Sequence, residues 1–308
     1  MPLKTAFSTR FQGSQEPMAL KIKFVDFWPG FEPGHNLLLS ALKTYFSDTR
    51  IVSCMPGQPY DICFCSIFGT ERFMERNRIM FLGENIRPDY QQCEASLSSD
   101  LDSYCGMNHY LPLWLLEYDI FQDNPYSTFD AQAFESLTKR QDPDPDFSLR
   151  SNQICAIFNN RELARINLLG SLGTAQMIDG YGRYYGRSFA PGYASKIALL
   201  RQYKFHFCTE NSYWPGYITE KIVHAKAAGC IPIYDSRNDS LGYLNTKSFI
   251  DLKNHDSSAI IGLILDLVEN RAEFLDYLSE PLFCFHPFTA SQIAGIVART
   301  VCEVLARA

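Results

Sequence analysis

Hydrophobic residues in the first half of the chain alternate with polar ones in one segment, form short apolar runs in three others and once recur with the spacing of a helix. Residues 20–28, 51–54, 62–68 and 78–82 read as strands. Residues 37–46 read as a helix, with apolar Leu38, Leu39, Leu42 and Phe46 on one face. Strands that alternate with helical segments predict an open, parallel α/β sheet.

A break in the chain separates this pattern from a second one of the same kind. The stretch QDPDPDF, residues 141–147, holds two prolines and three aspartates and fits neither a helix interior nor a central strand. Beyond it, residues 154–158, 204–208, 230–234 and 248–251 read as strands. Residues 161–172, 193–202 and 218–228 read as helices, and the glycine-rich residues 179–186 as a loop. The pattern predicts a second α/β domain.

The rest of the chain is helical, over residues 257–269, 271–278 and 289–306. In the last segment Ile293, Val297, Val301 and Leu305 share one face, so this helix should pack on a core. We therefore divide the chain into a variable leader (1–20), two Rossmann-like domains (21–147 and 148–288) and a closing helix (289–308). The two domains are expected to face each other across a cleft.

Composition narrows the class of ligand. A net charge of −6 provides no general attraction for nucleic acid or an anionic membrane. No apolar run approaches the roughly 20 residues of a membrane span. The ten cysteines include no CxxC pair, and several lie inside apolar runs, which predicts buried free thiols in a reducing compartment. The six histidines form no metal-binding pattern, and no metal ligand is predicted.

The most informative segment is residues 203–235, where two short apolar runs flank a helical segment. The loop before the helix carries polar and aromatic side chains, namely Glu210, Asn211, Tyr213, Trp214 and Tyr217. Ligands of parallel sheets bind at the carboxyl ends of strands, where such loops meet helix N-termini. Lys221, in the first helical turn, could contact a diphosphate there. The alternative is a solvated Lys221 beside an ordinary N-terminal carboxylate, Glu220.

Two further groups could take part in chemistry. Arg183 lies in the glycine-rich segment DGYGRYYG, where backbone can approach a ligand and a guanidinium can clamp a phosphate. A mobile surface loop is the alternative. Glu84, between Gly83 and Asn85, follows a strand directly and could serve as a general base. A helix cap or a salt-bridge partner is the alternative there.

Residues 207–235, FCTENSYWPGYITEKIVHAKAAGCIPIYD, closely resemble the donor-binding signature of the α-1,3/4-fucosyltransferases, glycosyltransferase family 10. That signature contains an F-x-x-E-N element, Y-V/I-T-E-K, a helix of small residues and a V/I-P-I/V-Y strand. MFLGENIRPDY, residues 80–90, is similar to the G-E-N element of the acceptor-side domain, and ICAIFNN, residues 154–160, to the opening of the donor domain. The resemblance covers residues 20–252.

The resemblance implies a GT-B fold, with an acceptor-binding first domain and a GDP-fucose-binding second domain. The implied reaction is inverting transfer of L-fucose from GDP-β-L-fucose to an oligosaccharide or glycoconjugate. The acceptor hydroxyl would belong to GlcNAc or glucose in an N-acetyllactosamine- or lactose-type glycan, and the choice between 1,3 and 1,4 linkage stays open.

Motif positions imply a role for each candidate residue. Glu84 would be the general base, and Arg183 and Lys221 would stabilise the GDP leaving group. Glu220 would hold fucose or ribose hydroxyls. The remaining nucleotide-pocket residues would be Glu210, Asn211 and Tyr217, with further donor or acceptor contacts from Asn85, Tyr213, Trp214, Arg187 and Tyr234. Arg187 competes with Arg183 for the phosphate.

The chain also departs from the family pattern. Tyr234 is followed by Asp235-Ser236, where many members have Trp or Leu and then Gly. The membrane anchor of animal members and the heptad repeats of some bacterial ones do not occur. We expect a bacterial-type, cytoplasmic monomer or dimer, with peripheral attachment to the inner membrane face as the alternative. It should need no cofactor, with stimulation by Mn²⁺ or Mg²⁺ at most. Alternatives to fucosyl transfer are another GDP-sugar donor or a non-catalytic glycan- or nucleotide-binding protein.

Overall fold

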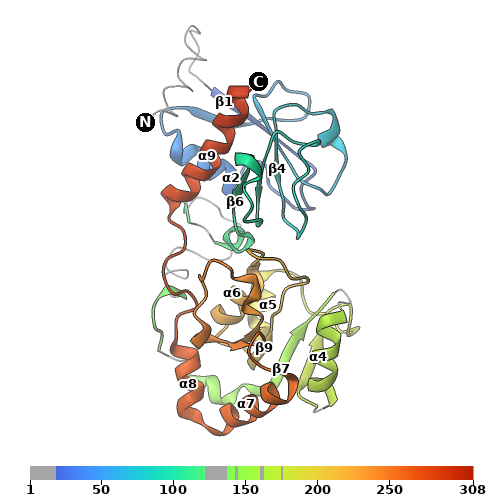
Figure 1. Ribbon diagram of the computed structural model, residues 1–308, viewed down its shortest axis with the longest axis vertical. Coiled ribbons are helices and arrows are strands. Elements are labelled where there is room, and N and C mark those ends of the chain that lie inside the picture. The colour runs from blue at the N-terminus through green and yellow to red at the C-terminus, as the bar shows by residue number, and fades with distance from the viewer. Residues whose placement is uncertain are drawn as a thin grey trace. The chain divides into compact units, whose positions relative to one another are not determined.

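The computed structural model describes residues 19–118, 120–121, 137–142, 145–159, 163–174 and 176–307 (Figure 1). The chain forms two compact units, one of Met1–Ser127 with Phe288–Ala308 and one of Thr128–Pro287. Each unit is built on one parallel sheet, so the predicted α/β class is confirmed. Residues 1–18 of the predicted leader lie outside the described residues. No described helix combines the length and apolar composition that crossing a membrane requires.

The first unit contains a six-stranded parallel sheet in the order β2-β1-β3-β4-β5-β6. The strands are β1 (Ala19–Val25), β2 (Arg50–Ser53), β3 (Ile62–Cys65), β4 (Arg78–Phe81), β5 (Ala95–Ser98) and β6 (Asn108–Tyr110). Because β1 lies between β2 and β3, the winding direction reverses there. Ligands of such sheets bind outside the carboxyl ends of the strands at this reversal.

Two helices from opposite ends of the sequence pack together in this unit. Helix α2 (Leu37–Tyr45) begins after Asn36, whose side chain accepts a hydrogen bond from the Leu39 amide at 3.0 Å. Helix α9 (Ala290–Arg307) begins with a capping box between Thr289 and Gln292, and it packs on α2, β4 and β5 (Figure 1). The closing helix thus completes the core of the first unit.

Strands β5 and β6 do not appear in the sequence pattern. The buried side chains of Ser96 and Ser98 both donate to Asn108 Oδ1, each at 2.8 Å. Small polar residues of this kind have low strand propensity, and here the tertiary hydrogen bonds hold them in the sheet. The unit also has short 3₁₀ helices, η1 (Glu71–Met74), η2 (Tyr104–Gly106) and η3 (Leu113–Glu117).

The second unit contains a five-stranded parallel sheet in the order β11-β10-β9-β7-β8. The strands are β7 (Ser151–Ile157), β8 (Ile178–Tyr181), β9 (Tyr203–Phe207), β10 (Ile231–Tyr234) and β11 (Ile250–Asp251). The helices are α4 (Leu163–Thr174), α5 (Tyr193–Leu200), α6 (Glu220–Ala227), α7 (Ser257–Glu269) and α8 (Arg271–Ser279), with 3₁₀ turns η4 (Pro145–Leu149), η5 (Ser236–Asn238) and η6 (Thr246–Ser248). Here the winding reverses between β7 and β9.

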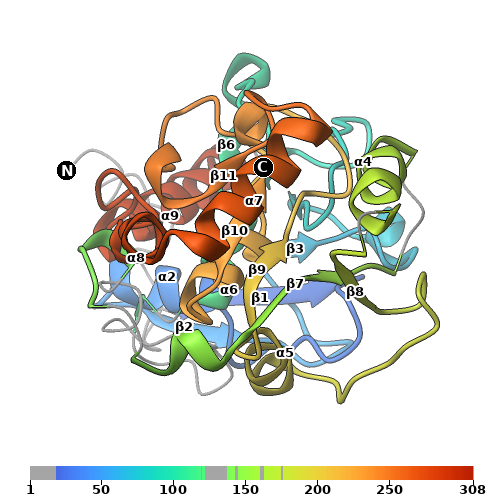
Figure 2. The same ribbon diagram turned by 90° about the horizontal axis from the view of Figure 1, so that it is seen from below.

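Helices cover both faces of this sheet, so strands β9 and β10 and the central residues of β7 are buried. Successive residues of β7 point to opposite faces. Ile154 packs against α4 and α7 on one side, and Cys155 packs against α5 on the other. Figure 2 shows α7 and α5 on opposite sides of the strands. Each layer holds its own apolar core.

Two features of the second unit bear on the sequence analysis. The glycine-rich segment was predicted as a loop, but Ile178–Tyr181 forms strand β8 at the sheet edge. An edge strand has one unpaired side and tolerates Asp179 and Gly180 there. All ten cysteines are free thiols, and seven of them are buried, as predicted.

Candidate functional site

The buried carboxylate of Glu210 organises the start of α6. Its Oε1 accepts from the Thr219 amide and its Oε2 from the Thr219 hydroxyl, both at 2.8 Å. The Tyr234 hydroxyl donates to Oε1 at 3.3 Å from the end of β10. Lys221 Nζ lies 2.8 Å from Oε2, and the Glu210 side chain is only 1% exposed. Glu210 therefore caps the helix from the preceding loop, and it ties the carboxyl ends of β9 and β10 together.

Lys221 is not a solvated surface residue, so the alternative stated for it is wrong. Its side chain is 21% exposed, and its amine also donates to Thr219 Oγ1 at 2.7 Å. Burial alone would lower the pKa of Lys221, but the carboxylates of Glu210 and Glu220 outweigh it and raise the pKa above its ordinary value. The amine stays protonated at neutral pH.

Glu220 is a carboxylate in the first turn of α6, between two lysines. Lys196 of α5 lies 3.5 Å from Glu220 Oε1, and Lys221 lies 4.0 Å from the same atom. Burial works to raise the pKa of Glu220, yet Lys221 and Lys196 lower it to about 2. Two carboxylates and two ammonium groups therefore balance in charge at this helix end.

The loop before α6 places its aromatic residues in different environments. Tyr217 is buried, whereas Tyr213 and Trp214 are exposed and Asn211 is half-buried. The Asn238 side chain accepts from the Trp214 amide at 3.3 Å, and its carbonyl accepts from the Gly216 amide at 2.7 Å. These contacts hold the loop against η5, so Tyr213 and Trp214 present their rings outward on a fixed backbone.

A pocket of about 330 Å³ lies beside the turn that follows β8. It is lined by Asn159, Gly182, Arg183, Gly186, Arg187, Ser188 and Phe189. Arg183 donates from its amide to Asn159 Oδ1 at 3.1 Å, which anchors it to the residue two positions after β7. Arg187 pairs with Asp179, and its guanidinium lies 4.0 Å from the ring centre of Tyr181. Both candidate arginines line the same pocket. The Arg187 guanidinium contacts two residues of β8, Asp179 and Tyr181.

Gly182 is required by the geometry of this turn. Its φ is +92°, and a Cβ there would lie 2.3 Å from the Phe158 carbonyl oxygen. We expect Gly182→Ala to lower the free energy of unfolding by about 2 kcal/mol, because strain and a backbone clash add. Gly186→Ala is the matched control, since its φ is +65° and nothing lies within 4 Å of its Cβ. Urea denaturation of both variants checks this, and equal losses would contradict the role of the Phe158 contact.

These groups lie along one edge of the second sheet. Because β7, β8 and β9 run parallel, Asn159, Arg183 and Glu210 all follow carboxyl ends. The winding reverses between β7 and β9, where such sheets bind nucleotides. The N-terminus of α6, Lys221 and the nearby arginines supply donors and positive charge, which is the chemistry that binds a diphosphate.

Glu84 lies in the first unit, three residues after β4. Its carboxylate is exposed, and within the described part of the chain it has no side-chain hydrogen bond or ion pair. Within the described residues, Glu84 is therefore not a salt-bridge partner. A methyl group on neighbouring Gly83 would lie 3.7 Å from Cζ3 of Trp28, whose ring is 6.2 Å from that of Phe81. An aromatic cluster thus flanks the turn that carries Glu84. Asn85 accepts a hydrogen bond from Arg87.

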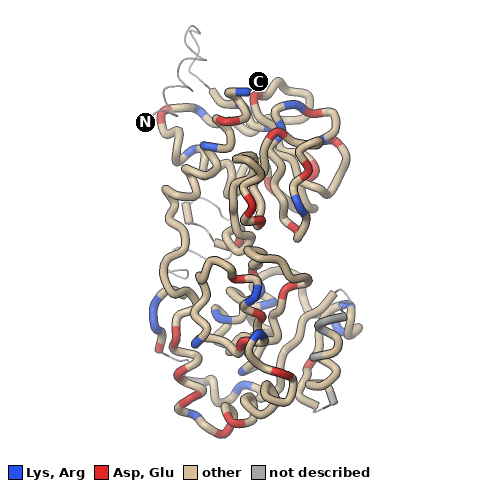
Figure 3. Tube along the Cα trace, viewed as in Figure 1, with Lys and Arg blue, Asp and Glu red and all other residues tan. Residues whose placement is uncertain are grey.

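Sequence reasoning missed Lys196 and Trp28. Lys196 is 24 positions from Glu220, on another helix, and no sequence spacing signals their contact. Trp28 stands at the end of a predicted strand, and only strand order could have shown that it neighbours Gly83. In both units, basic residues are interspersed with acidic ones along the chain (Figure 3). Among the described residues, no three of His, Cys, Asp or Glu cluster in a way that could hold a metal.

Comparison with protein families gives two matches. Residues 148–305 match glycosyltransferase family 10 (fucosyltransferase), C-terminal part, and residues 22–117 match the α-(1,3)-fucosyltransferase FucT N-terminal domain. Together the two matches cover both sheets. They agree with the residues that carry the resemblance in the sequence.

Individual relatives and solved structures point the same way. The α-(1,3)-fucosyltransferase FucT of Helicobacter pylori is 26% identical over 298 residues, 87% of this chain and 61% of that protein. Human 4-galactosyl-N-acetylglucosaminide 3-α-L-fucosyltransferase 9 is 29% identical over 123 residues, 39% of this chain and 34% of that protein. The chain thus spans less than two thirds of these relatives.

Solved crystal structures of α1,3-fucosyltransferase have the same fold as this chain. A crystal structure of α1,3-fucosyltransferase with GDP superposes with a TM-score of 0.68 at 20% identity, covering 95% of this chain and 92% of the other. One with GDP-fucose has a TM-score of 0.66 at 19% identity, over 94% and 92%. The fold is the two-domain GT-B type, as predicted. With its family match over residues 148–305, the chain belongs to glycosyltransferase family 10, the fucosyltransferases.

Proposed function

We propose that this protein transfers L-fucose from GDP-β-L-fucose, with inversion, to a GlcNAc or glucose hydroxyl of an N-acetyllactosamine- or lactose-type glycan. Family membership supports the fucosyl donor. The observation that carries the proposal is the first turn of α6, where Lys221 stays protonated against the buried Glu210. A fixed cation at a helix N-terminus suits a diphosphate that gains charge as it leaves.

In the proposed reaction the acceptor hydroxyl attacks C1 of fucose as the bond from C1 to the diphosphate oxygen breaks. Glu84 takes the proton from the attacking hydroxyl, and within the described residues no partner occupies the oxygens of its exposed carboxylate. GDP leaves with the electron pair, and we assign Lys221 and Arg183 to the charge on its phosphates. Attack from the face opposite GDP turns the β-linked donor into an α-linked product.

The second unit suggests a division of the donor contacts. Arg183 is our choice over Arg187 for the phosphates, because the Arg187 guanidinium pairs with the Asp179 carboxylate and stacks on Tyr181, whereas Arg183 Nε donates to the neutral Asn159 carbonyl. Glu220 carries negative charge at neutral pH and is proposed to accept hydrogen bonds from sugar hydroxyls. Glu210 and the buried Tyr217 and Tyr234 are proposed to shape the loop, while Asn211, Tyr213 and Trp214 supply its outward contacts.

A donor and acceptor screen tests the proposal. GDP-fucose and GDP-mannose are each offered with lactose, N-acetyllactosamine and its β1,3-galactosyl isomer. We expect turnover with GDP-fucose alone, and NMR of the product should show an α-fucosyl linkage and its position. Turnover with GDP-mannose and none with GDP-fucose would overturn the donor assignment. Thermal stabilisation by GDP without turnover on any acceptor would identify a binding protein instead.

A further inference from the structure

We propose that Arg87, Asp100 and Tyr104 form a positioning network that fixes the turn carrying Glu84. The proposal rests on the proposed role of Glu84 as the base. None of the three residues was singled out in the sequence, and we assign none of them contact with either substrate. They act through the backbone of the turn at the end of β4.

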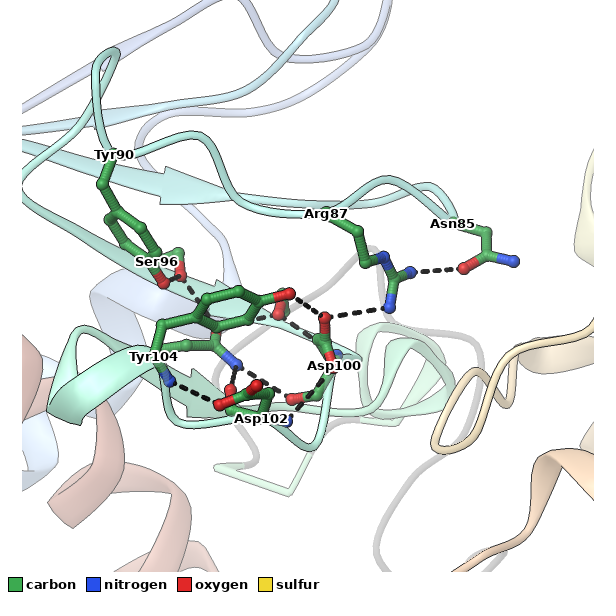
Figure 4. Close-up of polar contacts among 9 residues, drawn as sticks. Asn85, Arg87, Tyr90, Ser96, Asp100, Asp102 and Tyr104 are labelled. Carbon is green, nitrogen blue, oxygen red and sulfur yellow. Dashed lines mark hydrogen bonds and ion pairs between the residues drawn. The ribbon is translucent and has the colours of Figure 1, made fainter.

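The network is a chain of polar contacts that ends at Asn85, the residue after Glu84 in the sequence (Figure 4). Arg87 donates from Nη2 to the side-chain oxygen of Asn85. Its Nη1 lies 3.1 Å from Asp100 Oδ2, and the Tyr104 hydroxyl donates to the same oxygen at 2.7 Å. The guanidinium therefore links the residue next to Glu84 to a carboxylate on the neighbouring strand's loop.

Asp100 is a firm anchor because its own segment is held from several sides. Its side chain is 4% exposed. Asn108 Nδ2 donates to the Asp100 and Asp102 carbonyls at 2.9 and 2.8 Å. The Tyr104 amide donates to Asp102 Oδ1 at 2.8 Å, and Tyr104 keeps a left-handed φ of 45°. Such a conformation persists only where surrounding contacts determine it.

The turn itself is short, and two of its residues, Glu84 and Ile86, are exposed. The Ile86 amide donates to the Glu84 carbonyl at 2.8 Å, which makes a tight turn. The Glu84 side chain is exposed, so the backbone of the turn sets the region that its carboxylate can reach. A general base must reach the hydroxyl within hydrogen-bond distance, and a shift of about 1 Å can cost about a hundredfold in rate.

Arg87→Lys tests this network. Lysine keeps the charge but lacks the planar fork that reaches Asn85 and Asp100 together. We expect kcat for fucosyl transfer to fall about tenfold or more, with KM for GDP-fucose unchanged. Arg78→Lys is the matched control. Arg78 begins the same strand at its opposite end and pairs with Glu94 at 3.0 Å, so this variant should keep its kcat.

A double variant separates positioning from a general structural effect. In a Glu84→Gln background, Arg87→Lys should cause no further loss, because the group that it positions can no longer accept a proton. If Arg87→Lys lowers kcat in the Glu84→Gln background as much as it does in the wild type, the network is overturned. It is also overturned if Glu84→Gln alone lowers kcat and Arg87→Lys alone does not. If Glu84→Gln alone keeps its activity, the proposed base fails instead, and the two failures are distinguished.

A milder variant covers the case in which Arg87→Lys does not fold. Tyr104→Phe removes only the hydroxyl that donates to Asp100. We expect a severalfold fall in kcat with KM for GDP-fucose unchanged and a cooperative thermal transition retained. An unchanged kcat in this folded variant would count against the network.

Discussion

Glu84→Gln will lower the turnover of fucosyl transfer by about 10²–10⁴-fold and leave GDP-fucose binding unchanged. Glutamine has the shape of glutamate but cannot take the proton from the acceptor hydroxyl. The exposed Glu84 side chain has no hydrogen bond or ion pair in the described part of the chain, so its replacement should not disturb the fold. Turnover measured by product chromatography and donor affinity measured by calorimetry separate the two effects.

Glu71→Gln is the control for this experiment. Glu71 is another exposed carboxylate of the first unit, at the start of η1, and has no proposed role in catalysis. Its replacement should leave both kcat and donor affinity unchanged. Near-full transfer by Glu84→Gln would show that the base is another group, whereas a loss of donor binding would place Glu84 in the donor site.

Glu210→Ala will destabilise the second unit by about 3 kcal/mol and weaken GDP-fucose binding. The substitution removes the acceptor for the Thr219 amide, the Tyr234 hydroxyl and the Lys221 ammonium group. A largely buried cation without its partner costs more than the pair contributed. Urea denaturation followed by a probe in the second unit measures the loss, and calorimetry measures the affinity.

Two companion variants identify the cause. Glu210→Gln keeps an acceptor for the Thr219 amide, so its loss of stability should be smaller. Lys221→Met in the Glu210→Ala background removes the stranded charge and should recover part of the stability, but not GDP-fucose binding. Equal stability of the single and double variants would mean that the helix cap, and not the buried charge, dominates.

The start of α6 could be predicted because its signals are local. Apolar runs mark β9 and β10, and the loop between them holds Glu210 within eleven residues of Lys221. The sequence therefore indicated which polar residues lie around the start of this helix. Their roles did not follow, since a buried Glu210 that caps the helix and pairs with Lys221 depends on side-chain packing. For that reason the sequence alone does not distinguish a Lys221 that contacts a ligand from a Lys221 that is solvated.

The parts that could not be predicted depend on contacts between distant segments. Strand β5 has buried serines that are hydrogen-bonded to the Asn108 side chain and, for Ser96, also to the Tyr90 hydroxyl, so neither propensity nor period marks it. Lys196 reaches Glu220 from another helix. Arg87 belongs to no sequence pattern, because its contact is with Asp100, which comes thirteen residues later on the next strand's loop.

The packing of α9 on α2 has a consequence for biosynthesis. The first unit needs Ala290–Arg307 for its core, although its other elements are translated before residue 128. On the ribosome, the second unit therefore has all its residues while the first still exposes the apolar side of α2. The unit made first is completed last, and chaperones that bind exposed apolar surface would find it during that interval.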